Sequence, residues 1–451
     1  MKKTTALISL VAASAFATAA MAQVPAAQVG RLGGNLTPVG AEKGGNGDIP
    51  AWTGGLPTVP SNVTYAPGDK LPNPFASDAI RFTVTGANMA QYDTNLTDGY
   101  RALLSTYPSY KMDVYPSRRS CAFPDSVYAA TRRNAEVGSL GDGGNGVTQA
   151  IMGFPFPIPN NALEIIWNHT LRFRSFKLTR QFTAAAVTRS GDYTLQTVQD
   201  EAIFQWSDPS KGSAEELDNI SIYYIANTVA PARSAGSVIL VHETLNRSID
   251  PRKAWSYSPG TRRVRRAPNI AYDNPGTNSD GLSTSDSFDG YNGAPDRYNW
   301  SVLGKEEKFI AFNNYDAEAT PYADYISPLH VNQNAVRYEL ARTWRIEATL
   351  KPGNRHVYGR RVKSINEDSW SISSSDMYDA RGELWRVQEL QQIQRYNVPL
   401  CGTSAEVVYD LQAGRYLALA MTNEEPQINY FADELDPERY TPASIRQMGV
   451  R

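Results

Sequence analysis

The chain has few of the residues on which catalytic and metal sites are usually built. Its 451 residues include 2 cysteines and 4 histidines. The histidines are scattered along the sequence, at His169, His242, His330 and His356. His242-Glu243 opens no H-E-x-x-H motif, no G-x-S-x-G motif is present, and the aspartates from 280 to 289 lack EF-hand spacing. We therefore predict no catalytic residue, no metal site and no cofactor, and expect a protein that is not an enzyme.

The sequence also lacks a strong net charge and, beyond its first residues, a long hydrophobic run. Lys and Arg number 44 and Asp and Glu number 46, a balance that argues against nucleic acid as a partner. Residues 1–22 have the form of a signal peptide, with Lys2 and Lys3, an apolar stretch, and the small-residue cleavage site Ala20-Met21-Ala22. We predict cleavage after Ala22, export, and no integral membrane segment in the remaining chain.

The two cysteines, Cys121 and Cys401, leave two possibilities open. In an oxidising compartment they can form a disulfide bond across 280 positions of sequence, which the chain-entropy model values at about 4–5 kcal/mol. Alternatively they are independent thiols, because a sequence does not give the separation of the two Cα atoms.

The run from Val336 to Leu350 alternates between apolar and polar residues. Its apolar face is interrupted once, by Arg342, and its other face is polar apart from Ala341. Period-2 alternation over this length predicts one very long strand, or a bent one, in a large antiparallel sheet. The apolar face of such a sheet must be covered by helices of the protein, by a ligand, or by both.

The remaining segments predict an α+β protein. We expect helices from Asn88 to about Tyr107, from Asp125 to Val137 and from Asn161 to Trp167, followed by strands from Arg172 onward. Residues 23–76 are rich in Gly and Pro and predict an irregular arm on the body, or alternatively a disordered leader. Residues 77–430 form the predicted main domain, in which 269–293 is a long polar loop, and residues 431–451 form a tail with a short helix.

Several sequence segments resemble domain-of-unknown-function family 1329. They are LTPVGAEKGG, IPAWTGG, MDVYPSRRS, FPFPIPNNALEIIWNH, VHETL, KAWSYSPGTRRVRRAPNIAYDNPG and DRYNW. The family contains secreted proteins of Gram-negative bacteria in the LolA/LolB-like superfamily. The resemblance implies a periplasmic protein with a curved, open antiparallel sheet, a half-barrel whose concave face is lined with apolar side chains and lidded by helices. The helices near Asn88 and Asn161 are the expected lids.

Candidate binding residues fall into a charged set and an aromatic set. Arg263 and Arg265 share one face of a predicted strand and could hold an anionic head group at the cavity mouth. Alternatively, following aspartates pair with these arginines: Asp273, Asp280, Asp286, Asp289 and Asp296. Arg342 meets a ligand, pairs with a carboxylate such as Glu389, or marks where its strand leaves the core. The aromatic candidates, which are either cavity lining or plain core, are Trp255, Tyr257, Trp344, Trp370 and Trp385.

Together these observations favour a non-catalytic periplasmic carrier for a lipid or another hydrophobic molecule. An accessory protein that docks an envelope transporter or an outer-membrane barrel is the alternative, since the arm and the 269–293 loop exceed what a small carrier needs. A hydrolase whose catalytic residues are distant in sequence is a third hypothesis.

Overall fold

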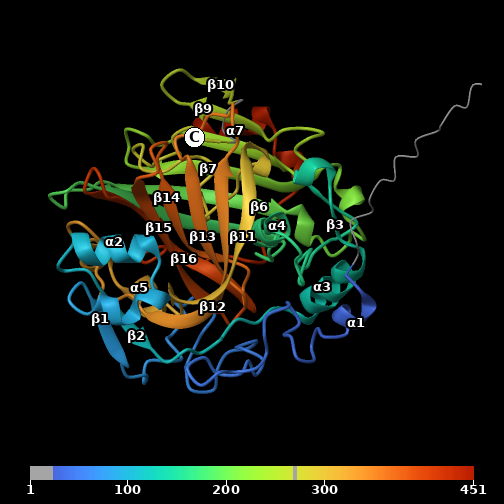
Figure 1. Ribbon diagram of the computed structural model, residues 1–451. Coiled ribbons are helices and arrows are strands. Elements are labelled where there is room, and N and C mark those ends of the chain that lie inside the picture. The colour runs from blue at the N-terminus through green and yellow to red at the C-terminus, as the bar shows by residue number, and fades with distance from the viewer. Residues whose placement is uncertain (1–23, 268–271, 451) are drawn as a thin grey trace, which may run out of the picture.

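The computed structural model describes residues 24–267 and 272–450, so the predicted signal peptide lies outside the described residues. Most strands belong to one 15-stranded, largely antiparallel sheet that is strongly curved and open (Figure 1). The strands are β1 (Phe82–Thr85), β2 (Lys111–Tyr115), β5 (Lys177–Val187), β6 (Leu195–Phe204), β7 (Ile220–Ala230), β8 (Val238–Thr244), β9 (Lys253–Ser258), β10 (Arg263–Arg266), β11 (Tyr298–Ala311), β12 (Tyr338–Leu350), β13 (Arg360–Asn366), β14 (Ile372–Tyr378), β15 (Leu384–Arg395), β16 (Leu400–Asp410) and β17 (Arg415–Met421). The predicted fold class, a large curved antiparallel sheet with helices, is confirmed.

The predicted long strand is β12, whose 13 residues form the branch point of the sheet. It pairs along its whole length with β11, along Thr343–Thr349 with β13, and in parallel with β2 at Tyr338 and Glu339. From β13 the sheet runs in chain order to β17, which pairs with β5, and then continues through β6, β7, β8 and β9 to β10. The β17–β5 pairing joins two halves of the sheet that are far apart in sequence.

Helices cover both faces of the sheet rather than one. The helices are α1 (Ala26–Val29), α2 (Asp98–Thr106), α3 (Asp125–Val137), α4 (Ala162–Thr170), α5 (Tyr315–Ala319), α6 (Tyr322–Tyr325) and α7 (Pro442–Val450). On β15, Val387 packs in the apolar cluster that contains α2, and Leu390 packs in the cluster that contains α4. Residues three apart on a strand point to opposite faces, so α2 and α4 cover opposite sides of the sheet.

The single helix predicted from Asn88 to Tyr107 is wrong. The structure has a 3-10 helix over Met89–Asn95 and then α2, which begins at Asp98. Thr97 caps α2 by accepting a hydrogen bond from the Tyr100 amide, whereas the Asn88 side chain accepts from the Thr85 amide and closes the turn after β1. The helices predicted from Asp125 and Asn161 are confirmed, the latter with Asn161 accepting from the Glu164 amide.

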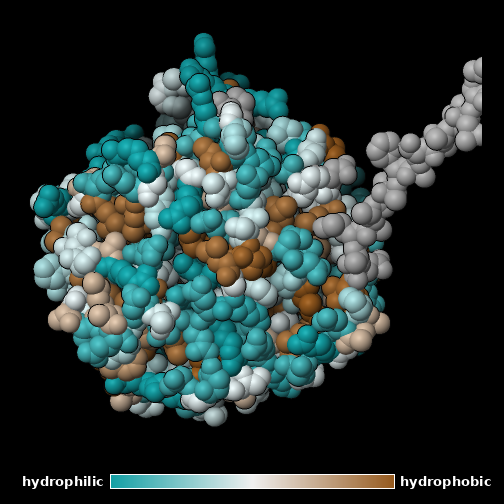
Figure 2. Space-filling model, in the orientation of Figure 1, coloured by the Kyte–Doolittle hydropathy of each residue, from teal (hydrophilic) through white to brown (hydrophobic). Residues whose placement is uncertain are grey.

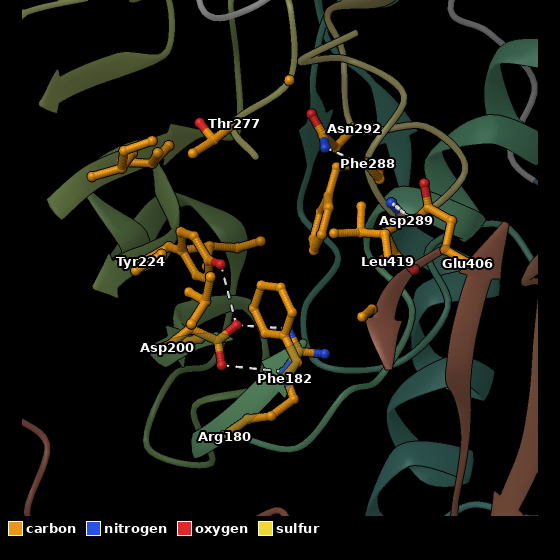
Figure 3. Close-up of a pocket in the computed structure, with 18 of the residues that line it drawn as sticks. Arg180, Phe182, Asp200, Tyr224, Thr277, Phe288, Asp289, Asn292, Glu406 and Leu419 are labelled. Atoms are coloured by element: carbon orange, nitrogen blue, oxygen red, sulfur yellow. Dashed lines mark hydrogen bonds and ion pairs between the residues drawn. The ribbon is translucent and has the colours of Figure 1, made fainter. Parts of the chain in front are cut away.

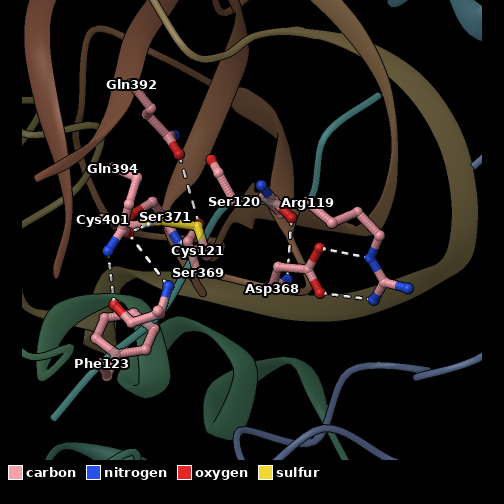
Figure 4. The surroundings of a disulfide bond; sticks show 12 residues. Arg119, Ser120, Cys121, Phe123, Asp368, Ser369, Ser371, Gln392, Gln394 and Cys401 are labelled. Carbon is pink, nitrogen blue, oxygen red and sulfur yellow. Dashed lines mark hydrogen bonds and ion pairs between the residues drawn. A yellow bond between two sulfur atoms is a disulfide. The ribbon is translucent and has the colours of Figure 1, made fainter. Parts of the chain in front are cut away.

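The N-terminal segment before β1 lies along the body instead of forming a separate unit. Leu36, Val39 and Ile49 are buried, and the indole of Trp52 donates to the carbonyl oxygen of Cys121. Cys121 forms a disulfide bond with Cys401 at the start of β16, which resolves the alternative that the sequence left open (Figure 4).

One face of the molecular surface is shown in Figure 2. The face in Figure 2 is mainly hydrophilic, with small hydrophobic patches between polar side chains. None of the helices in residues 24–267 and 272–450 has both the length and the apolar character needed to cross a membrane.

Candidate functional site

A cavity lies on one face of strands β5 to β8. Its apolar floor is built from alternate residues of these strands, which include Leu178, Phe182, Val198, Ala202, Ile222 and Ile239. Alternation places every second side chain on the same face, so four neighbouring strands give a surface that is largely apolar and is interrupted by Arg180 and Asp200. Phe182, Phe288 and Leu419 point into this space from the sheet, the 272–292 loop and β17 (Figure 3). The volume is about 440 Å³, within the range of about 300–1,000 Å³ that is usual for small-molecule sites.

One wall of the cavity carries a balanced ion pair. Arg180 Nη2 lies 2.6 Å from Asp200 Oδ2, and the Tyr224 hydroxyl donates to the same oxygen at 3.1 Å (Figure 3). The Asp200 side chain has no exposed surface, so its charge is compensated entirely inside the protein. This wall therefore adds polar atoms to the cavity without adding net charge.

Residues 272–293 of the predicted loop cover the cavity and are fixed by two aspartates, Asp286 and Asp289. Asp286 Oδ2 lies 2.7 Å from Arg361 Nη2 and 3.1 Å from His356 Nε2. Arg361 is on β13, and His356 lies just before it. Asp289 pairs with Arg172 and Arg174, which lie between α4 and β5. Asp289 Oδ2 is 2.9 Å from Arg174 Nη1. The loop is thus a structural part of the site, because charged groups of the body hold both aspartates.

Glu406 is a buried carboxyl group at the cavity whose pKa is strongly shifted. Its oxygens accept hydrogen bonds from the Asp289 amide at 2.7 Å and from Gln388 Nε2 at 2.6 Å. Burial, together with the negative charge of Asp289, raises the pKa of Glu406 to about 8. At neutral pH this carboxyl group is therefore mostly protonated, so it contributes little negative charge to the cavity wall.

Glu406→Gln is expected to change the pH dependence of stability. Because the folded-state pKa exceeds the usual 4.5, the Glu406 contribution is fully present below pH 4.5 and is lost as the pH rises toward 8. The wild type should lose on the order of 3 kcal/mol relative to the variant between pH 4.5 and pH 7. Denaturant unfolding of both proteins across this range measures the difference, and parallel pH profiles would contradict the assignment.

The predicted aromatic residues do not gather at one site. Tyr257 lies at the cavity rim, where its ring packs on Gly449 of α7, while Trp255 contacts His242 on the α7 side of the sheet. Trp344 stacks with the fully buried Trp370 at 6.3 Å, and Trp385 donates to Asp410. Apart from Tyr257, these residues pack in the core outside the cavity.

The predicted arginines lie at two places. Arg263 and Arg265 are exposed on β10, and Arg265 pairs with Ser256, a cavity-lining residue, so its side chain is on the cavity face beyond the rim. The prediction that nearby aspartates clamp them is wrong, because these aspartates bind other groups. The partners are Arg297 for Asp273, Arg415 for Asp280, Arg361 for Asp286, Arg172 and Arg174 for Asp289, and Tyr272 for Asp296.

Arg342 lies away from the cavity, at a polar hollow between the N-terminal arm and β11. Its guanidinium donates to the Gly44 carbonyl oxygen at 2.9 Å and lies 3.7 Å from Glu367. Glu389, the partner considered from the sequence, instead accepts from the Tyr338 hydroxyl. The structure agrees with the second of the three interpretations of Arg342, an ion pair within the protein. Its carboxylate partners, such as Glu367, differ from the expected Glu389.

The sequence analysis missed Arg172, Arg174 and Arg180, which contribute the main cationic groups of the cavity on the β5 side. A signal was present, because Arg180 interrupts the alternating apolar set of Leu178 and Phe182 in the same way that Arg342 interrupts β12. A charge on an apolar face marks either an internal ion pair or a ligand contact.

We also considered whether the described residues form a hydrolytic or metal site elsewhere. Ser109 Oγ lies 2.8 Å from His330 Nε2, but the second ring nitrogen of His330 faces the Val331 carbonyl oxygen rather than a carboxylate. A hydrolytic triad orients its histidine with a carboxylate, so this part-buried pair resembles a structural hydrogen bond more than a triad. Within the described part of the chain, no group of three or more His, Cys, Asp or Glu is placed to hold a metal ion.

The chain is similar to several known proteins. A protein of Pseudomonas aeruginosa described as uncharacterised is 46% identical over 465 residues, covering 100% of both chains. A Vibrio parahaemolyticus domain named for outer-membrane lipoprotein sorting is 12% identical, with a TM-score of 0.44, over 63% of this chain and 98% of that one. A DUF1329 protein of Desulfovibrio piger is 14% identical, with a TM-score of 0.41, over 60% of this chain and 92% of that one.

The family model for DUF1329, described as a protein of unknown function, matches residues 83–446. This span includes the whole sheet except the first residue of β1, and both sides of the cavity. The chain therefore belongs to the DUF1329 family.

Proposed function

We propose that this chain is a periplasmic, non-catalytic binding or carrier protein for a lipid or another hydrophobic molecule. The observation that carries the proposal is the largely apolar floor of the cavity, together with its volume of about 440 Å³. The signal-like sequence of residues 1–22 supports export. Reversible burial of apolar surface accounts for such a function without a covalent step.

Burial of an alkyl chain makes a large favourable contribution to affinity. Each buried methylene contributes about 0.8 kcal/mol, so about ten methylenes contribute about 8 kcal/mol before the cost of association. The balanced Arg180–Asp200 pair allows apolar groups to lie beside it, because no net charge on that wall is left without a partner.

Ligand binding can be tested by native mass spectrometry of gently purified protein, with lipid extraction, and by titration with environment-sensitive apolar probes. Ala226 lines the cavity from β7, so Ala226→Trp should fill part of it and lower probe affinity by at least about tenfold. Ala129→Trp adds the same bulk at an exposed position of α3 and should leave the affinity unchanged. A ligand-free protein that binds no probe, or equal effects of both substitutions, would refute the proposal.

A further inference from the structure

One end of the cavity holds two arginines that share a single aspartate. Arg172 and Arg174 both pair with Asp289, and Arg172 also donates to the His169 carbonyl oxygen at 2.8 Å. The Nε atoms of both arginines are buried and have no hydrogen-bond partner within residues 24–267 and 272–450. The Arg172 side chain is 4% exposed, so its unused donor is held inside the protein. A buried donor without a partner is costly, which makes this end of the cavity incomplete.

A second cluster of charged side chains lies at the same end of the cavity. Glu243 lines the cavity and pairs with Arg247 at 2.6 Å and with Arg252, whose Nε lies 2.6 Å from the carboxylate. Both guanidinium groups also donate to the carbonyl oxygen of Asn292 in the covering loop. Glu243 and the covering loop therefore hold both of these arginines at this end of the cavity.

The nearby titratable groups do not remove the excess positive charge of Arg172 and Arg174. Glu406 is mostly neutral at pH 7, because burial raises its pKa to about 8, and burial lowers the pKa of His169, which keeps that ring uncharged. The pKa of Arg174 is lowered to about 10 by burial and by the positive charge of Arg172. Arg172 and Arg174 therefore share one carboxylate, whereas Arg180 has Asp200 to itself.

Arg174 is the residue that can reach a ligand. Its guanidinium lies 4.7 Å from the centre of the Phe204 ring, which fixes the plane of the group at the apolar floor. Its side chain keeps 23% of its surface exposed, and the residue lines the cavity. A guanidinium group offers a planar fork of donors that matches carboxylate and phosphate oxygens.

We propose, on the basis of the carrier function above, that the cavity binds an anionic amphiphile whose carboxylate or phosphate head group is held by Arg172 and Arg174. The apolar body of the ligand lies on the β5–β8 floor, and the head group supplies the missing negative charge at the arginine end. This location differs from the rim, where Arg263 and Arg265 are exposed to solvent.

The head groups can be compared with three ligands that have the same alkyl chain length: tetradecanoate, tetradecyl phosphate and tetradecanol. The affinity of each is measured by competition with an environment-sensitive probe at pH 7. At least one of the two anions should bind about tenfold more tightly than the alcohol, and their order identifies the preferred head group. Arg174→Gln should weaken anion binding about tenfold while the alcohol binds as before. Arg172 still pairs with Asp289 in this variant, and unchanged alcohol binding reports an intact fold.

Arg265→Gln is the matched control, since it removes an arginine from the cavity face outside the rim. The control should keep the preference for anions. Equal affinity of the alcohol and both anions in the wild type, or an undiminished preference in Arg174→Gln, overturns the head-group assignment and leaves the carrier function standing. Loss of the preference in Arg265→Gln places the head group at the rim and also overturns it. Failure of every amphiphile to bind refutes the carrier function itself.

Discussion

Removal of the disulfide bond between Cys121 and Cys401 is expected to lower the free energy of unfolding by about 4–5 kcal/mol. The bond closes a loop of 280 residues and so restricts the unfolded chain strongly, because the entropy of loop closure grows with loop length. Both cysteines are buried, at 2% and 1% exposure, and they join the segment after β2 to the start of β16 (Figure 4). The cross-link therefore ties the N-terminal part of the fold to the central sheet.

The double variant Cys121→Ala/Cys401→Ala and the reduced wild type provide two measurements of this effect. The double variant loses the two buried sulfur atoms as well as the bond, whereas the reduced protein keeps the sulfur atoms. Denaturant unfolding of both against the oxidised wild type separates the cross-link from the packing. An oxidised protein no more stable than the reduced one would show that the bond adds nothing to stability.

The long strand was predictable because its signal is local. In β12 apolar and polar residue types alternate along the sequence, and such a pattern does not depend on which strands lie beside it. The capping of α4 by Asn161 was predictable for the same reason, since the donor and acceptor are three residues apart. The break between Asn95 and Asp98 was missed because helical spacing of apolar residues continues across it, and only Thr97 marks the new start.

The cavity could not be predicted because it depends on pairings between distant segments. Its two sides come together where β17 pairs with β5, which brings Leu419 near residues such as Phe182 that precede it by more than two hundred positions. The arm poses the same difficulty. Its sequence lacks periodicity, so nothing local places Gly44 and Glu42 beside Arg342.

Asp286→Asn is expected to cost about 3–5 kcal/mol of stability, because it leaves a buried arginine without its partner. Arg361 is fully buried, and its Nη2 atom lies 2.7 Å from Asp286 Oδ2. The rings of Tyr298 and Tyr358 lie 5.0 Å from its guanidinium carbon, and among the described residues Asp286 is the carboxylate within ion-pair distance of it. Asparagine can still accept a hydrogen bond, but it does not compensate the charge.

The cost of Asp286→Asn should depend on pH in a defined direction. The positive charge of Arg361 and the hydrogen bond from His356 hold the pKa of Asp286 well below its usual 3.8, although burial alone would raise it. The stabilisation is therefore present above about pH 4 and is lost as the pH falls through the folded-state pKa. The difference between the wild type and the variant should be largest near neutral pH and should shrink in acid.

A second substitution distinguishes the effect of the uncompensated Arg361 charge from a general disturbance of the covering loop. In Asp286→Asn/Arg361→Met the buried charge is removed together with its partner, and much of the lost stability should return. Apolar-probe affinity should fall in Asp286→Asn, because Asp286 fixes the loop that places Phe288 over the cavity, and recover in the double variant. A double variant as unstable as Asp286→Asn alone would show that the ion pair is not the source of the effect.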